Sequence, residues 1–267
     1  MGVPELSIGQ YYPGHSLLHR LDPRPKLIFV FIYVILIFFA NNAASLLWMG
    51  SIVLGALAIS RIPPTVLLKG MKPVFWLLLL LAAMHLFLTR EGPVLFRWGW
   101  FAVYDEGARQ AVIISARLLF LISISSLLTY TTRPMDLTFG LEKLFAPLKR
   151  FRVPVGELSL MMSIALRFIP TLMEEADKIM KAQMARGADF ESRNLASRAR
   201  SLLPLLVPLF VSSFHRAEDL AMAMEARGYR GEEGRTRFRQ LAMRRADWFM
   251  LLAALPVSLI LFLLRTW

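Results

Sequence analysis

The segment Leu27–Ala40, LIFVFIYVILIFFA, contains no charged side chain and is apolar almost without interruption. Two polar residues, Asn41 and Asn42, follow it, and the chain is apolar again over Ala44–Ser60. A bilayer core about 30 Å thick is crossed by about 20 mostly apolar residues of helix, and an Asn pair suits a short turn between two helices. The stretch therefore predicts a membrane hairpin.

Three further apolar segments predict three more membrane-spanning helices. They are Pro73–Thr89, Ala111–Tyr130 and Trp248–Leu264. With apolar residues making up 56% of 267 positions, the chain is predicted to be an all-α integral membrane protein with five transmembrane helices. It contains no cysteine, which excludes disulfides and thiolate metal sites.

The basic residues are concentrated in the middle of the chain. Arg133–Arg245 holds 20 of the 31 Lys and Arg residues but 13 of the 19 Asp and Glu residues. Loops rich in Lys and Arg stay on the cytoplasmic side of a membrane, and four spans from a cytoplasmic N-terminus return the chain to that side. The formal net charge of +12 thus indicates how the chain is oriented in the cytoplasmic (inner) cell membrane, and it does not indicate a nucleic-acid partner.

Two apolar stretches within this basic region are predicted not to cross the membrane. Val153–Met173 carries Glu157 and Arg167, and each charge would cost roughly 3 kcal/mol near the bilayer centre. Leu202–Phe214 is too short for a span. We therefore expect three amphipathic cytoplasmic helices over Pro134–Arg150, Pro154–Arg186 and Leu195–Arg227.

These features divide the chain into four expected parts. They are a cytoplasmic segment (1–26), a four-span membrane domain (27–131), a cytoplasmic coupling-helix region (132–245) and a last transmembrane helix (246–267). A basic cluster between the second and third amphipathic helices, Arg193, Arg198 and Arg200, suits lipid headgroups, so membrane lipids are an expected partner.

A tripeptide is repeated at the ends of two of the amphipathic helices. Residues 176–187 align with residues 217–228, which pairs Ala185-Arg186-Gly187 with Ala226-Arg227-Gly228. Glycine just past a helix closes it in the left-handed conformation, and arginine in the last turn complements the helix dipole. One such end is ordinary, but two on consecutive basic helices favour arginines that dock into partner grooves and pair with carboxylates.

The residues Gly14–Leu27, GHSLLHRLDPRPKL, lead into the first apolar run. This entry sequence and the two Ala-Arg-Gly motifs resemble the transmembrane T component of energy-coupling factor (ECF) transporters, the EcfT and CbiQ family. The resemblance covers nearly the whole chain.

The resemblance implies a scaffold subunit without chemistry of its own, cofactor or metal site. It implies that two cytoplasmic ABC-type ATPases receive Arg186 and Arg227, with Ala185, Gly187, Ala226 and Gly228 allowing close approach. It further implies that the chain cradles a small substrate-binding membrane subunit, the S component. ATP hydrolysis by the ATPases would thereby drive vitamin or metal-ion uptake, with specificity set by another chain.

Two other classes of function fit this sequence less well than a scaffold. An enzyme would need paired catalytic groups, and Glu174-Glu175 is better interpreted as a solvated helix face with Lys178 and Lys181 at helical spacing. No Gly-Lys dipeptide occurs, which excludes a P-loop in this chain. A stand-alone secondary transporter would use charged groups within its spans, for which His85 and Arg117 are the candidates, and their roles stay open.

Overall fold

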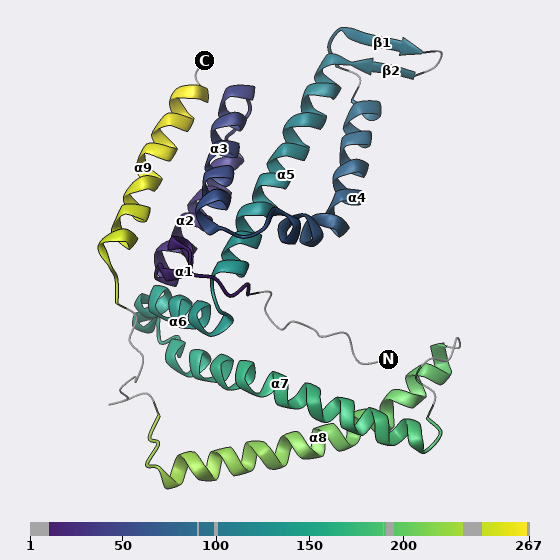
Figure 1. Cartoon of the computed structure of the whole chain (residues 1–267), viewed down its shortest axis with the longest axis vertical. Coiled ribbons are helices and arrows are strands. Elements are labelled where there is room, and N and C mark those ends of the chain that lie inside the picture. The colour runs from purple at the N-terminus through teal and green to yellow at the C-terminus, as the bar shows by residue number, and fades with distance from the viewer. Residues whose placement is uncertain are drawn as a thin grey trace. The chain divides into compact units, whose positions relative to one another are not determined.

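The computed structural model describes residues 11–89, 91–98, 101–188, 190, 195–231 and 242–265 of the chain. Contacts divide the chain into two compact units. We call residues 9–144 and 241–267 the membrane unit, and residues 145–240 the helix-pair unit. Figure 1 shows that the described chain is mostly helical, as the sequence predicts.

The membrane unit consists of helices joined by short turns, with one small β-hairpin. Its elements are α1 (Leu17–Arg20), α2 (Pro23–Ile37), α3 (Ala43–Ser60), α4 (Pro64–Leu88), β1 (Val94–Trp98), β2 (Phe101–Tyr104), α5 (Asp105–Thr131), α6 (Pro134–Phe145) and α9 (Arg245–Arg265). In Figure 1 the hairpin lies at the junction of α4 and α5. The sequence did not predict these two antiparallel strands, which pair from Val94 with Tyr104 to Trp98 with Phe101.

Local sequence signals determine where the first two long helices begin. Asp22 caps α2 by accepting a hydrogen bond from the backbone N–H of Arg24 at 3.0 Å, and Pro23 occupies the first helical position, where no N–H is needed. At the start of α3, Ser45 Oγ accepts a hydrogen bond from the backbone N–H of Asn42 at 3.1 Å. The predicted turn between the two helices is confirmed.

An apolar core joins α2, α3, α4, α5 and α9. Two hydrogen bonds cross it: the Tyr33 hydroxyl donates to the Met49 carbonyl at 3.0 Å, and the Trp48 indole N–H donates to the Val257 carbonyl at 3.4 Å. The core consists of closely packed aliphatic and aromatic side chains: Tyr33, Leu36, Ile37, Ala40, Leu46, Met49, Val53, Ile62, Leu67, Ile124, Leu127, Tyr130, Val257 and Leu261. Helices distant in sequence therefore form one packed body.

Helix α4 begins earlier in the chain than the sequence predicts. The predicted span starts at Pro73, but Pro64 already occupies the first position of the helix. The segments Pro64–Lys72 and Val74–Leu88 meet at a bend of 64°. Proline inside a helix lacks an N–H for the backbone ladder and crowds the preceding turn, so the residue taken for a helix start marks a bend in an existing helix instead.

The helices that are long and apolar enough to cross a membrane differ slightly from the set that the sequence predicts. Among the described residues, α3, α5, α9 and α7 (Val155–Ala185) qualify, and α4 qualifies if its bent halves form one span. Helix α2 has 15 residues, fewer than a full span needs, although Phe38 and Phe39 extend its apolar length. The chain is a multi-pass membrane protein.

Arg117 closes the turn between α2 and α3. Its Nη2 donates to the Ala40 carbonyl at 3.0 Å and to Asn41 Oδ1 at 3.2 Å, and its guanidinium lies 5.8 Å from the ring centre of Phe38. A cation at a helix C-terminus complements the helix dipole. The charge of Arg117 is thus used within the chain to fix this turn, which gives it a structural role.

The helix-pair unit contains one short 3₁₀ helix and two long α-helices. They are η1 (Ala146–Phe151), α7 (Val155–Ala185) and α8 (Leu195–Ala226). The predicted second and third amphipathic helices are confirmed to within one residue at each end. Residues 134–145 of the predicted first amphipathic helix form α6, which belongs to the membrane unit. Within that unit, Gly140 of α6 lies against Pro23 and Leu27.

Four large apolar side chains of α7 and most of those in the described part of α8 are exposed. They are Leu158, Met161, Met162, Met184, Leu202, Leu203, Leu206, Val207, Phe210, Val211, Phe214 and Met222. Contiguous apolar surface of this extent marks contact with lipid or with another protein. Arg193 and the side chains of Arg198 and Arg200, the predicted lipid contacts, lie outside the part of the chain that the structure describes.

Helices α4 and α5 approach closely at Gly107, and this contact predicts an asymmetry between two glycines. A Cβ on Gly107 would lie 2.9 Å from the His85 carbonyl oxygen and 3.1 Å from that of Thr89, whereas a Cβ on Gly55 would have no atom within 4 Å. We expect Gly107→Ala to destabilise the protein by about 1–3 kcal/mol because backbone must move, and Gly55→Ala to be neutral or slightly stabilising. Thermal unfolding of both variants in detergent measures this, and equal midpoints would contradict the contact.

Candidate functional site

The first Ala-Arg-Gly motif forms the C-terminal cap of α7. The backbone N–H of Gly187 donates to the Met184 carbonyl at 3.0 Å, and that of Ala188 donates to the Gln183 carbonyl at 3.0 Å. Gly187 has a φ of 89°, in the left-handed region. This pair of hydrogen bonds is a Schellman motif, which ends the helix and satisfies its last carbonyls.

The second motif caps α8 with the same pattern of hydrogen bonds. The backbone N–H of Gly228 donates to the Glu225 carbonyl at 2.8 Å, and that of Tyr229 donates to the Met224 carbonyl at 3.0 Å. The φ of Gly228 is 73°. The sequence repeat is therefore also a structural repeat, since both glycines stop their helices and both arginines occupy the last position before the stop.

Both motifs are open to their surroundings. The residues Ala185, Arg186, Gly187, Ala226, Arg227 and Gly228 are all exposed. A Cβ on either glycine would meet no atom within 4 Å. Within the described residues, neither guanidinium forms an ion pair, so each offers a planar, permanently charged fork to a carboxylate on another molecule. Small neighbours on both sides allow a second backbone to come close.

An ion pair joins α7 to α8 between these two ends. Glu175 accepts hydrogen bonds from the Ser212 hydroxyl and from the Arg216 guanidinium, both on α8. All three side chains are partly buried. The prediction that Glu175 belongs to a solvated face is therefore wrong, because this carboxylate points at the neighbouring helix. The surface pair on α7 is Lys181 with Asp177, at 2.5 Å.

A groove with a cavity volume of about 310 Å³ lies between the two helices beside this ion pair. Its lining is almost entirely apolar: Ile164, Phe168 and Leu172 from α7, and Ser213, Arg216, Ala217, Leu220, Ala221 and Met224 from α8. The groove lies between the middle of α7 and the C-terminal half of α8. The two helices are thus not packed tightly along their whole lengths.

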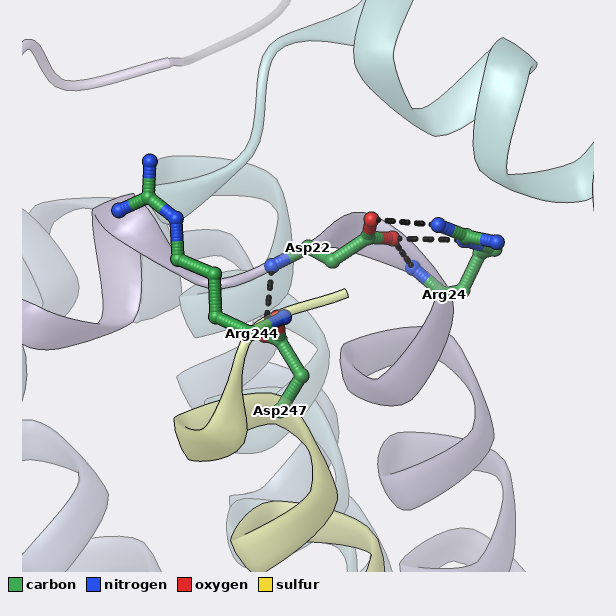
Figure 2. A network of polar contacts seen from close by, with 4 residues as sticks. All are labelled: Asp22, Arg24, Arg244 and Asp247. Atoms are coloured by element: carbon green, nitrogen blue, oxygen red, sulfur yellow. Dashed lines mark hydrogen bonds and ion pairs between the residues drawn. The ribbon is translucent and has the colours of Figure 1, made fainter. Parts of the chain in front are cut away.

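The Leu-Asp-Pro-Arg sequence forms a polar cluster at the start of α2, shown in Figure 2. Asp22 Oδ1 accepts from Arg24 Nε at 3.0 Å, and Asp22 Oδ2 accepts from Arg24 Nη2 at 2.8 Å. Burial alone would raise the pKa of Asp22, but the hydrogen bonds and charge of Arg24 outweigh it and hold that pKa below its usual value. The charged side chains of this motif therefore pair with one another at the start of the helix.

Asp247 connects this cluster to the last helix. Its Oδ1 accepts from the backbone N–H of Asp22 at 2.8 Å, and its Oδ2 accepts from that of Arg244 at 2.6 Å. The side chain is almost fully buried, with 1% of its surface exposed. A buried carboxylate needs such donors, and this one receives them from the starts of two different helices, α2 and α9 (Figure 2).

Lys26 extends the cluster to the end of α5. Its Nζ donates to the Thr131 carbonyl at 3.2 Å and to Thr132 Oγ1 at 3.1 Å, and the residue is 3% exposed. An ammonium group at a helix C-terminus satisfies free carbonyls and complements the dipole. The short segment from Leu21 to Lys26 thus holds the ends of three helices together.

Two contacts were not predicted, although the sequence contains a signal for each of them. Asp247 is the third residue of α9, a position from which an acidic side chain reaches back to the capping residue, Arg244. Glu175 and Arg216 are separated by the offset of the repeat and lie immediately before the aligned segments. Opposite charges at equivalent positions of paired helices indicate a contact between them.

In the described part of the chain, no group of three or more His, Asp or Glu side chains is placed to hold a metal ion. His85 contributes its backbone, whose carbonyl accepts from the Thr89 N–H at 3.3 Å at the end of α4.

The left-handed glycines predict a graded response to substitution. Gly228→Ala should loosen the end of α8 by about 1 kcal/mol because an L-residue is strained at this φ, and Gly228→Asn should do less because Asn tolerates it. Hydrogen exchange at the amides of residues 228 and 229 reports the change. Equal protection in all three proteins would show that the cap is not as described.

The two hydrogen bonds to Asp247 predict a large effect at a position far from the repeated motifs. Asp247→Ala should destabilise the membrane unit by about 2–4 kcal/mol because two buried N–H groups lose their acceptor. Asp105→Ala, at the start of α5 but exposed, is the matched control and should cost a few tenths of a kcal/mol. Unfolding in detergent compares the two, and similar losses would refute the role of Asp247.

Comparisons with known proteins agree with this architecture. Residues 14–238 match the model of a family described as CbiQ, cobalt transport protein. The chain is 51% identical to the energy-coupling factor transporter transmembrane protein EcfT of Bacillus subtilis (strain 168), over 98% of this chain and 99% of that protein. It is 53% identical to the EcfT of Brevibacillus brevis, over 99% and 98%, and 46% identical to that of Staphylococcus aureus (strain 04-02981), over 98% and 97%. The chain therefore belongs to the CbiQ and EcfT family of energy-coupling factor transporter transmembrane proteins.

Proposed function

We propose that this chain is the membrane scaffold of an ECF-type transporter and transmits ATP hydrolysis by two cytoplasmic ATPases to a substrate-binding membrane subunit. The observation that carries the proposal is the pair of equivalent helix ends, each with an exposed arginine directly before a left-handed glycine. Two equivalent ends suit two related partners. The transported substrate is a vitamin or a metal ion, bound by the substrate subunit.

The docking chemistry follows from the geometry of each end. Arg186 and Arg227 each insert a guanidinium into a surface groove of one ATPase and pair there with a carboxylate. The flanking alanine and glycine residues let the walls of the groove reach the helix backbone. A desolvated arginine–carboxylate pair transmits force well because its geometry is bidentate and its charges have no alternative partner nearby.

The exposed apolar surface of α7 and α8 supports a second contact for the same unit. A protein that remained isolated in water would bury these leucine, methionine and phenylalanine side chains. We assign this surface to the substrate subunit and to lipid, and the arginine ends to the cytoplasm. The same assignment places the N-terminus and residues 145–240 on the cytoplasmic side of the cell membrane.

The chain itself has no catalytic role in this proposal. Movement of the ATPases during their cycle displaces the two arginine ends, and α7 and α8 carry the displacement to the substrate subunit. The membrane unit, held together by its polar cluster and core, provides the fixed body against which the displacement acts.

Charge reversal tests the docking role directly. Arg186→Glu and Arg227→Glu should each weaken binding of one ATPase at least about thirty-fold, because each leaves two carboxylates facing one another. The double variant should still insert in the membrane but should neither copurify with ATPases nor support uptake. Lys69→Glu, which reverses an exposed charge on α4, is the control for net charge. A double variant that retains both ATPases and transports normally would overturn the proposal.

A further inference from the structure

The ion pair between Glu175 and Arg216 lies at the same distance along each helix from the two exposed arginines. Its members are 41 positions apart, and the same offset separates Arg186 from Arg227, so each arginine follows its member of the pair by the same interval. The interval is about three helical turns, and each helix therefore continues for about 16 Å from the ion pair to its capped end. We call the segment from the ion pair to the capped end of each helix an arm. The arm of α7 covers residues 175–186 and that of α8 covers residues 216–227, so the two arms are equal in length.

The two arms point in different directions. Figure 1 shows α7 and α8 crossing, with the C-terminal end of α7 on one side of the helix-pair unit and that of α8 on the other. Both arms extend from this contact between the two helices, so the contact influences how far apart their ends lie. A change of about 10° in crossing angle moves the end of an arm about 16 Å long by about 3 Å, and helix packing tolerates variations of that size.

The chemistry of this contact suits a fixed pivot. The carboxylate of Glu175 accepts from both a hydroxyl and a guanidinium, and the partial burial of these groups limits screening by water. A second hydrogen-bonded contact between α7 and α8, from Gln183 Nε2 to the Pro204 carbonyl, is longer, at 3.4 Å, and exposed. Apolar contacts alone can slide, whereas the ion pair specifies which turn of α7 meets which turn of α8.

The apolar groove beside the ion pair gives the arm of α8 room to move against the part of α7 that precedes Glu175. It leaves space between α7 and α8 on one side of the contact. Because the groove lining is almost entirely apolar, a small change in the angle there breaks no other ion pair or strong hydrogen bond. The angle can therefore change about the pivot without breaking it.

We propose that Glu175 and Arg216 are positioning residues that form the pivot of the helix pair and thereby set the spacing at which Arg186 and Arg227 are presented. The functional part of this inference rests on the proposed docking of ATPases. The geometric part does not, because the spacing of the two ends is a property of this chain alone.

Spin-label distances measure the spacing without reference to transport. The chain has no cysteine, so Met184→Cys and Glu225→Cys introduce two labels at exposed positions that are again related by the offset of the repeat. In the full-length protein we expect one narrow distance distribution. Glu175→Gln and Arg216→Ala should each broaden the distribution or shift its maximum.

Two controls make the result specific. The exchange variant, Glu175→Arg with Arg216→Glu, should restore a narrow distribution because it rebuilds the pair with its charges exchanged. Lys181→Ala removes an exposed ion pair within α7 and should leave the distribution unchanged. An unchanged distribution in both single variants, or an exchange variant no better than they are, would overturn the pivot.

Transport assays on the same variants separate this inference from the proposed function. Single pivot variants retain both arginine ends, so they should still copurify with ATPases but should transport less substrate per ATP hydrolysed, and the exchange variant should recover. Normal coupling in single variants whose spacing has changed would overturn the positioning role. Failure of the proposed function would instead appear as unaltered ATPase binding when Arg186 and Arg227 are themselves reversed.

Discussion

The buried carboxylate of Asp247 is the contact on which the membrane unit most depends. It accepts a hydrogen bond from the backbone of Asp22, 225 positions away in the chain, and another from the start of its own helix, and so brings the first and last long helices together. Lys26 joins the end of α5 to the same place. Because the charged groups of this cluster have partners, the helices can meet in an apolar core without leaving these buried charges unsatisfied.

The helix-pair unit is packed less closely than the membrane unit. Its long helices meet at an ion pair, enclose a groove and expose many large apolar side chains, most of them on α8. Its two capped ends are defined by backbone hydrogen bonds that any Schellman motif provides, and their arginines are exposed. One unit is thus a packed body, and the other leaves apolar side chains and both arginine ends exposed.

Much of this could be predicted from the sequence because local signals were strong. Uninterrupted apolar runs predicted the long apolar helices of the membrane unit, and glycine after arginine predicted the ends of α7 and α8 to within one residue. The bend in α4 was missed because Pro73 suits a helix start as well as an interior kink. Asp247 and Glu175 were missed because their partners lie on other helices, and a charge in one sequence does not reveal which distant group it meets. The role of Arg117 required coordinates for the same reason.

We expect the two capped arginine ends to touch ATPases in the assembled transporter. Photo-crosslinking from benzoylphenylalanine introduced in place of Ala185 or Ala226, in the native host and with wild-type arginines, tests it most directly. We expect each position to yield a crosslink to an ATP-binding subunit, and the same probe in place of Val112 on α5, an exposed position in the membrane unit, to yield none. Crosslinks from both helix ends to lipid or to the substrate subunit alone would contradict it.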